Sequence, residues 1–235
     1  MRRPAFWWLC LCLLAGHASA RAPAEVTVLS TLHRLHAEVP AYDNAALARA
    51  IEKLTPDVLC IEIGPEAWAA RKPERTKVEY PQVVYPLIDA HDWPVCLLEP
   101  SDAVAKDMLS AYLPANQRFH AERPETGKAF NAWQAAMYEL LKHHWTTPAA
   151  VNDRLTDGLM QAKHAMQDAL VGADERQGWE AWNRHFLDRI VEAAQQHPGK
   201  RIVVLAGAEH GYWLRRELSA QPGLRTLDAA TLLAD

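Results

Sequence analysis

His33, Glu62 and His210 combine side-chain types and positions that could carry out chemistry. Each lies at or just after the end of a short apolar run, and Glu99 takes a similar place after another run. Neutral imidazole and carboxylate groups form a common ligand set for zinc, manganese or iron. The same groups without a metal can act as a general acid and base. The sequence therefore predicts either a metal centre or an acid/base site.

Each of these residues also has a structural interpretation. A histidine after a strand can be a surface or capping residue, and His36 can be a simple neighbour of His33 on one helical face. Glu99 can cap the helix that follows it. Glu62 stands among apolar residues, where an unpaired carboxylate is costly to bury, so we expect it to have a partner. Their common position at the ends of apolar runs favours the functional interpretation.

The turn before His210 has a physical rationale. Gly207 stands three residues earlier, and glycine permits a tight turn with positive φ. The next turn would then carry the imidazole back over the end of the preceding run. If His210 opens a helix, the positive end of the helix dipole also favours an anion nearby.

The elements that must position these residues form an α/β fold with a mainly parallel sheet and flanking helices. Continuous apolar runs separated by helical patterns are typical of strands buried on both faces. In such open sheets, ligands bind outside the carboxyl ends of the strands, where the candidate residues fall. The expected strands cover residues 25–30, 57–63, 94–98, 201–206 and 224–227, and the expected helices include 44–54, 81–90 and 211–219.

The segment 102–197 predicts a helical insertion between the third and fourth strands, long enough to act as a lid. It contains no run that resembles a strand, and prolines and a glycine punctuate it. Aromatic residues at helical spacing are usually core, but they could also line a lid for a hydrophobic ligand. His143 and His144 beside Trp145 could then supply a haem ligand. The expected helices cover residues 102–112, 126–144, 151–170 and 174–196.

The first twenty residues have the layout of a secretory signal peptide. Arg2 and Arg3 precede the apolar run 6–16, and residues 18–20 (ASA) suit signal peptidase. We therefore expect a periplasmic or secreted protein without a stable membrane anchor, whose residues 21–235 form one α/β domain. Without Arg2 and Arg3, 23 basic residues remain against 29 acidic ones, and no basic block is left, so nucleic acid is not an expected partner.

Two cysteines, Cys60 and Cys96, remain outside the expected signal peptide, each inside an apolar run. An oxidising compartment permits a disulfide between them. Two small buried free thiols are equally compatible with the sequence.

The arrangement resembles the TraB/TIKI superfamily, which also groups pheromone-shutdown, GumN-like, erythromycin-esterase-like and ChaN-like haem-binding proteins. That family has two GxxH motifs, a Glu after the second strand and an Arg in a helix before the last motif. Residues 207–210 (GAEH) match the late motif, Glu62 matches the acidic position and His33 matches the early histidine. Ser30 stands where the family has its early glycine. For the arginine, the sequence offers Arg184 first and Arg189 second.

The resemblance implies an exported hydrolase of a peptide or a small-molecule ester. His33, Glu62 and His210 would hold a divalent metal such as manganese, cobalt or zinc, or would share the acid/base work. Arg184 would stabilise a developing oxyanion or bind a substrate carboxylate. The alternative is a ChaN-like periplasmic protein that binds haem or another small ligand without catalysis, and a third possibility is the same fold without activity.

Overall fold

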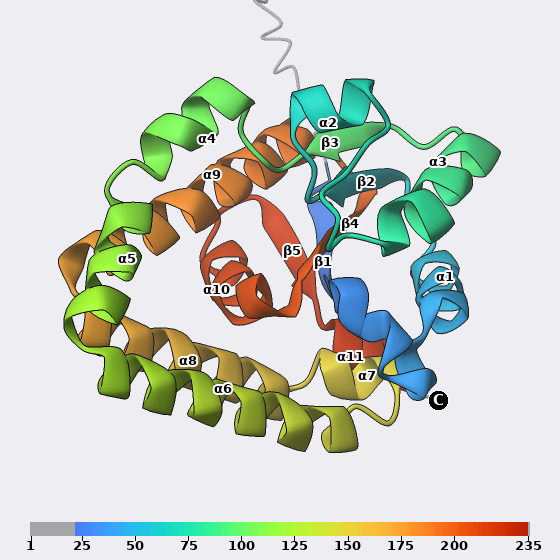
Figure 1. Ribbon diagram of the computed structural model, residues 1–235. Coiled ribbons are helices and arrows are strands. Elements are labelled where there is room, and N and C mark those ends of the chain that lie inside the picture. Colours follow the sequence, from blue (N-terminus) through green and yellow to red (C-terminus); the bar gives the residue numbers. More distant parts are fainter. Residues whose placement is uncertain (1–21, 235) are drawn as a thin grey trace, which may run out of the picture.

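A parallel sheet with helices on both faces organises the structure, a computed structural model that describes residues 22–234 (Figure 1). The expected signal peptide lies outside the described residues. Within them, five parallel strands form one sheet in the order β3-β2-β4-β1-β5, which confirms the predicted α/β fold. The strands are β1 (Ala24–Thr31), β2 (Val58–Ile61), β3 (Val95–Leu97), β4 (Arg201–Gly207) and β5 (Leu224–Leu227).

Both faces of the sheet are buried, which is why the strands read as continuous apolar runs. On β4, Val203 and Leu205 pack toward one side, while Ile202 and Val204 pack toward the other. The first side is covered by α1 (Asn44–Lys53) and α3 (Tyr85–His91), and the second by α9 (Ala173–Gln196) and α10 (Ala208–Ser219) (Figure 1).

Cys60 and Cys96 lie side by side on β2 and β3. They are register partners in the sheet, and both are buried free thiols in the structure. Burial raises the pKa of the Cys60 thiol well above its usual value. The two sulfur atoms therefore contribute to the core beneath α9 as small, largely apolar side chains.

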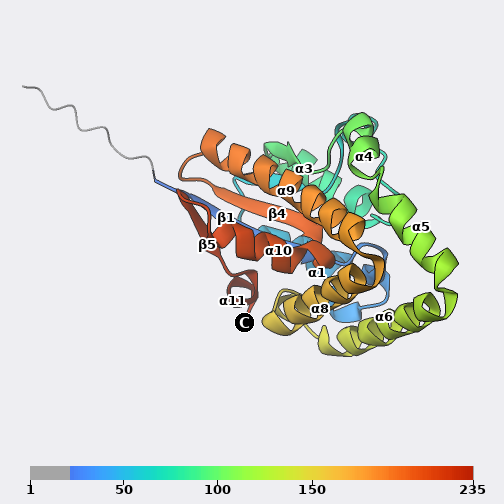
Figure 2. The same cartoon turned by 90° about the vertical axis from the view of Figure 1, so that its left-hand side faces the viewer.

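The segment between β3 and β4 is helical, as predicted. Figure 2 shows α5, α6 and α8 beyond the carboxyl ends of the strands, so this part of the insertion lies at the edge where the candidate residues were expected, whereas α9 packs on one face of the sheet. A closing motion of this insertion stays a prediction. Its helices are α4 (Asp102–Met108), α5 (Tyr112–Glu122), α6 (Pro124–His144), α7 (Pro148–Val151), α8 (Arg154–Val171) and α9.

Two parts of the helical prediction were wrong. The expected helix 102–112 ends at Met108, and α5 covers residues 112–122, most of which were expected to lie outside the helices. Pro114 lies in the first turn of α5, where the missing N–H costs little. Helix α10 begins at Ala208, three residues earlier than expected. His210 therefore lies in the first turn of α10, directly after β4.

The remaining helical elements are short. A 3-10 segment η1 (His33–Ala37) follows β1, α2 (Pro65–Ala69) follows β2, and a π-helical segment (Tyr80–Val84) runs into α3. Helix α11 (Ala229–Leu233) follows β5. Across residues 22–234, every helix is too short or too polar to cross a membrane.

Candidate active site at the carboxyl ends of the strands

The sheet brings His33, Glu62 and His210 together. They follow β1, β2 and β4, and β4 lies between the other two strands. The Nε2 atom of His33 lies 3.7 Å from Oε1 of Glu62, and the Nε2 atom of His210 lies 4.0 Å from the same oxygen. The placement agrees with the prediction from the strand ends, while the metal-binding and catalytic roles of the three residues stay predictions.

Glu62 is the centre of this cluster and is buried, with 5% of its surface exposed. Its Oε2 accepts a hydrogen bond from the backbone N–H of Gly207 at 2.6 Å. Burial alone would raise the pKa of Glu62, but the positive charges of Lys77 and His33 outweigh burial and hold the pKa well below 4.5. Glu62 is therefore an ionised carboxylate whose Oε1 faces both imidazoles.

His33 is held in an uncommon backbone conformation. Its φ is 50°, in the left-handed region that non-glycine residues rarely adopt. Its Nδ1 lies 2.8 Å from Oε1 of Glu79, and because a carboxylate only accepts, Nδ1 carries the proton. Burial alone would lower the pKa of His33, but Glu62 and Glu79 raise the pKa to about 10. Backbone strain held by surrounding structure is typical of functional positions.

His210 is buried and neutral. Burial lowers its pKa to about 4, despite the nearby carboxylate of Glu62. Its Nδ1 lies 2.8 Å from Oδ1 of Asn183, whose Nδ2 donates to the carbonyl of Trp179. This second bond fixes the amide so that its oxygen faces the imidazole. The proton of His210 is therefore on Nδ1, and the lone pair of Nε2 points toward Glu62.

Lys77 is part of the cluster and was missed by the sequence analysis. Its Nζ lies 3.2 Å from Oε1 of Glu62, donates to the Glu62 carbonyl at 2.9 Å and donates to Oε1 of Glu99. Burial raises the pKa of Glu99 to about 7 even beside this ammonium group. One feature of the sequence could have pointed to Lys77 and Glu79. These two charged residues stand within three positions before Tyr80, where a largely apolar segment begins.

Gly207 is needed because His33 and Glu62 lie very close to its Cα. The expected reason, a turn with positive φ, was wrong. Its φ is −54°, a value open to any residue. A Cβ at this position would lie 2.7 Å from Nε2 of His33 and 3.5 Å from Oε2 of Glu62. Only glycine leaves room for both side chains against the end of β4.

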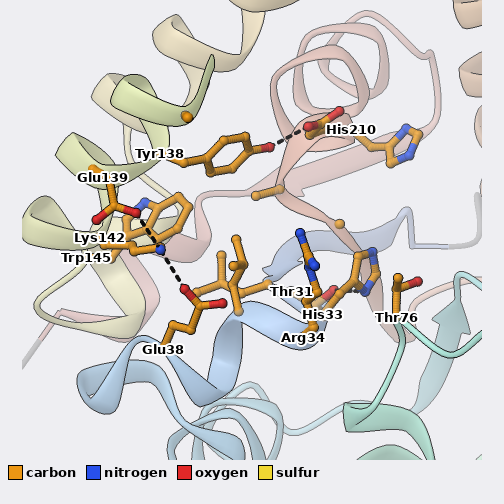
Figure 3. Close-up of a pocket in the computed structure, with 16 residues that line it drawn as sticks. Thr31, His33, Arg34, Glu38, Thr76, Tyr138, Glu139, Lys142, Trp145 and His210 are labelled. Carbon is orange, nitrogen blue, oxygen red and sulfur yellow. Dashed lines mark hydrogen bonds and ion pairs between the residues drawn. The ribbon is translucent and has the colours of Figure 1, made fainter. Parts of the chain in front are cut away.

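A cleft of about 560 Å³ opens beside the cluster. His33 and His210 line one side, and Tyr138 and Lys142 of α6 line another (Figure 3). Gly207 also lines the cleft. Tyr138 donates its hydroxyl to Glu209, the residue before His210, and Lys163 of α8 lies 2.7 Å from the same carboxylate. These contacts join the helical insertion to the start of α10 and build the cleft wall.

Other predicted candidates lie elsewhere. Arg184 is exposed, and its guanidinium lies 5.8 Å from the ring centre of Trp213, while the preceding residue, Asn183, contacts His210. Arg189 donates to the carbonyl of Leu97. The structure gives neither arginine a contact with His33, Glu62 or His210. His36 has a structural role, since its Nδ1 donates to the Tyr42 carbonyl and its Nε2 accepts from the Leu32 amide.

The histidines considered as haem ligands are outside the His33, Glu62 and His210 cluster. His143 is exposed, and His144 lies 2.7 Å from a carboxylate oxygen of Asp153. Trp145 is buried and donates to Thr156. Haem binding stays a prediction.

The donor set of His33, Glu62 and His210 fits a divalent metal. Two imidazole Nε2 atoms face one carboxylate oxygen at 3.7 and 4.0 Å, against about 3.4 Å between ligands bonded at about 2.1 Å to a tetrahedral ion. Both distances are longer than that spacing, so the side chains would have to move closer together to hold a metal ion. Within residues 22–234, no group of three or more His, Cys, Asp or Glu side chains is already close enough to hold a metal ion.

Comparison of the chain with protein-family models, with curated proteins and with solved structures gives no match. Membership in the TraB/TIKI superfamily stays a prediction from residues 207–210, Glu62 and His33.

Proposed function

We propose that this chain is an exported hydrolase of peptide or ester bonds, and that His33, Glu62 and His210 form its reaction centre. One observation carries the proposal: both histidines direct Nε2 at the same Glu62 oxygen, while acceptors on other elements hold both Nδ1 atoms. Such outer contacts are what orient imidazoles that bind a metal or transfer protons. The proposal includes membership in the TraB/TIKI superfamily. The closeness of His33, Glu62 and His210, the three residues that match its pattern, supports this assignment.

A divalent metal such as manganese, cobalt or zinc would be held by the Nε2 atoms of His33 and His210 and by Oε1 of Glu62. When bound, such a metal lowers the pKa of a bound water and polarises a carbonyl oxygen. The distances of 3.7 and 4.0 Å exceed those of hydrogen bonds. The raised pKa of His33 leaves a proton on its Nε2 in the metal-free protein, and Lys77 Nζ lies 3.2 Å from the same Glu62 oxygen. A metal would therefore have to displace the His33 proton and the Lys77 contact in order to bind.

Neighbouring residues fix the charge and the orientation of Glu62 and His210. Lys77 and the Gly207 N–H keep Glu62 ionised and fix the direction of its carboxylate. Asn183 holds the proton of His210 on Nδ1, and burial lowers the pKa of His210 so that the ring is neutral at pH 7. The positive end of the α10 dipole points at the same edge and favours negative charge that develops on a substrate oxygen.

The cleft has the size for a small substrate. A volume of about 560 Å³ falls within the range of small-molecule sites. Apolar and aromatic side chains, among them Leu35 and Trp145, line it beside the polar residues. A short peptide or a small ester matches this mixture.

The test uses purified residues 21–235, stripped of metal and reconstituted with Mn²⁺, Co²⁺ or Zn²⁺. A panel of fluorogenic peptides and nitrophenyl esters is assayed with wild type, His210→Gln and the control His143→Gln, whose histidine is exposed. We expect metal-dependent hydrolysis that His210→Gln abolishes and His143→Gln leaves intact. Hydrolysis that is equal in all three proteins would contradict the proposal, and a Soret band with no turnover would favour the haem-binding alternative.

A further inference from the structure

Arg34 is set apart from the other charged side chains that line the cleft. Lys142 lies 2.6 Å from Glu38 and 2.7 Å from Glu139, and Glu209 is bound by Lys163 and Tyr138. The two cleft histidines are held by Glu79 and Asn183. In the described part of the chain, the guanidinium of Arg34 has neither a hydrogen bond nor an ion pair, and it acts on Glu38 only at longer range. Arg34 is exposed, so a ligand would take the place of water on its donors.

The position of Arg34 places this guanidinium beside the reaction centre. Arg34 directly follows His33 in η1, and both residues line the same cleft. In Figure 3 the Arg34 side chain projects from η1 next to His33, toward the turn between β4 and α10. The wall that carries His33 therefore also presents a planar fork of N–H donors, the geometry that binds carboxylate oxygens in pairs.

The charges around the cleft decide which anion fits. Lys142 is shared by Glu38 and Glu139, so this group of three has a net charge of −1. An incoming dianion such as a phosphate monoester would meet one free guanidinium and a surplus carboxylate. A monoanion can pair with Arg34 at a lower electrostatic cost. Leu32 and Leu35 line the cleft on either side of Arg34 in the sequence and favour an apolar group next to that monoanion.

We infer that Arg34 forms a subsite for a substrate carboxylate beside the scissile bond, as in a peptide cleaved next to an apolar C-terminal residue. The inference rests on the proposed hydrolase function and gives its substrate class. Arg34 would then have the carboxylate-binding role that was expected of Arg184.

The test uses two ligands that differ only in the charged group: hippuryl-phenylalanine, with a free carboxylate, and hippuryl-phenylalaninamide. Binding to His210→Gln protein, which should not turn them over, is measured by isothermal titration. The same background carries Arg34→Ala, Arg34→Lys or the control Arg49→Ala, an exposed arginine on α1. Wild-type turnover of both ligands is measured separately.

We expect Arg34→Ala to weaken binding of the carboxylate ligand by about 10-fold to 100-fold, as for a charge-assisted hydrogen-bonded pair. The amide ligand should bind with unchanged affinity, Arg34→Lys should recover part of the loss, and Arg49→Ala should have no effect. Equal losses for both ligands, an equal loss with Arg49→Ala, or no saturable binding of either ligand would overturn the subsite.

Further outcomes separate the two proposals. Carboxylate-selective binding without wild-type turnover of either peptide would retain the subsite and count against the peptidase function. Equal turnover of both peptides would retain the hydrolase and overturn the subsite. Phenyl phosphate serves as the second anion, and Arg34-dependent binding of phenyl phosphate tighter than that of hippuryl-phenylalanine would overturn the assignment to a carboxylate.

Discussion

Two polar clusters lie near the end of β1, and they differ in how many of their side-chain polar atoms take part in hydrogen bonds. In the first, which we call the Arg215 cluster (Ser30, Asn152, Asp157 and Arg215), the guanidinium donates to Ser30 Oγ at 2.9 Å, to Asn152 Oδ1 at 2.7 Å and to the Asp157 carboxylate. In the second, the candidate site, the Nε2 atoms of His33 and His210 lie 3.7 and 4.0 Å from Oε1 of Glu62, beyond hydrogen-bond distance.

The contrast separates a structural use of buried charge from a functional one. The Arg215 cluster joins α10, α8 and β1, and most of its donors are used inside the protein. The Nε of Arg215 is the exception, a buried donor without a partner in the described part of the chain. In the candidate site, the Nδ1 atoms of His33 and His210 contact Glu79 and Asn183, which orients the two rings. Within residues 22–234, neither Nε2 atom forms a hydrogen bond. Two imidazoles oriented in this way are the arrangement expected of a site that acts on a ligand.

The largest expected effect is on catalysis when His33 is replaced. Asn tolerates the left-handed backbone of His33, so His33→Asn should fold and still lose one Nε2. We expect kcat/KM of the folded protein to fall by about 1000-fold or more, and the free energy of unfolding to fall by about 3 kcal/mol because the buried Glu79 carboxylate loses its partner. Kinetics and urea unfolding check this. A variant that keeps its activity, or that loses it only through unfolding, would place the site with the structural cluster.

Arg215→Met should lose a similar amount of stability but keep its activity. Removing the guanidinium leaves the Asp157 carboxylate without its partner, at a cost of about 3 kcal/mol of stability. The folded fraction should keep its activity within a few-fold. Urea unfolding measures the stability, and Arg215→Met with Asp157→Leu should recover part of the loss. A selective loss of kcat with unchanged stability would show that the Arg215 cluster also takes part in function.

A smaller effect on catalysis is expected from one added methyl group. In Gly207→Ala, the new Cβ would meet Nε2 of His33 at 2.7 Å and displace the ring. Misplacing a reacting group by about 1 Å can cost about 100-fold in rate. Gly158→Ala is the matched control, because a Cβ there meets nothing within 4 Å. Equal kcat/KM values for both variants would contradict the close-approach account of Gly207.

The last expected effect is on stability alone, a pH dependence of stability in the metal-free protein. The folded pKa of His33, about 10, is above the ordinary 6.5. Its stabilisation is therefore fully present below about pH 6.5 and is lost as the pH rises through about 10. The melting temperature of wild type should fall more steeply from pH 7 to 10 than that of His33→Asn. Parallel curves for the two proteins would show that the carboxylates do not hold a proton on His33.

The sequence predicted the sheet and the three central residues for the same physical reason. Apolar runs buried on both faces identify parallel strands, and the carboxyl ends of such strands share one edge. His33, Glu62 and His210 could therefore be placed together without knowledge of the strand order. The helical character of the segment between β3 and β4 followed from its periodicity, but its position over that edge did not.

The residues that orient the site could not be predicted in this way. Lys77 and Glu79 come from a loop, and their partners are 15 and 46 residues away in the chain. On α9 the choice between Asn183 and Arg184 depends on a rotation of about 100° around the helix axis, which periodicity alone did not fix. The open guanidinium of Arg34 is visible only once the partners of the other cleft charges are known.

The most direct test of the open site is a titration of metal-free protein with Co²⁺, followed by its visible absorption, in wild type, His33→Asn, His210→Gln and Arg215→Met. We predict one Co²⁺ per chain in wild type and in Arg215→Met, and binding weakened by at least about 100-fold in both histidine variants. No Co²⁺ binding by folded wild type, or equal binding by all four proteins, would contradict the claim that His33, Glu62 and His210 are arranged to receive a metal.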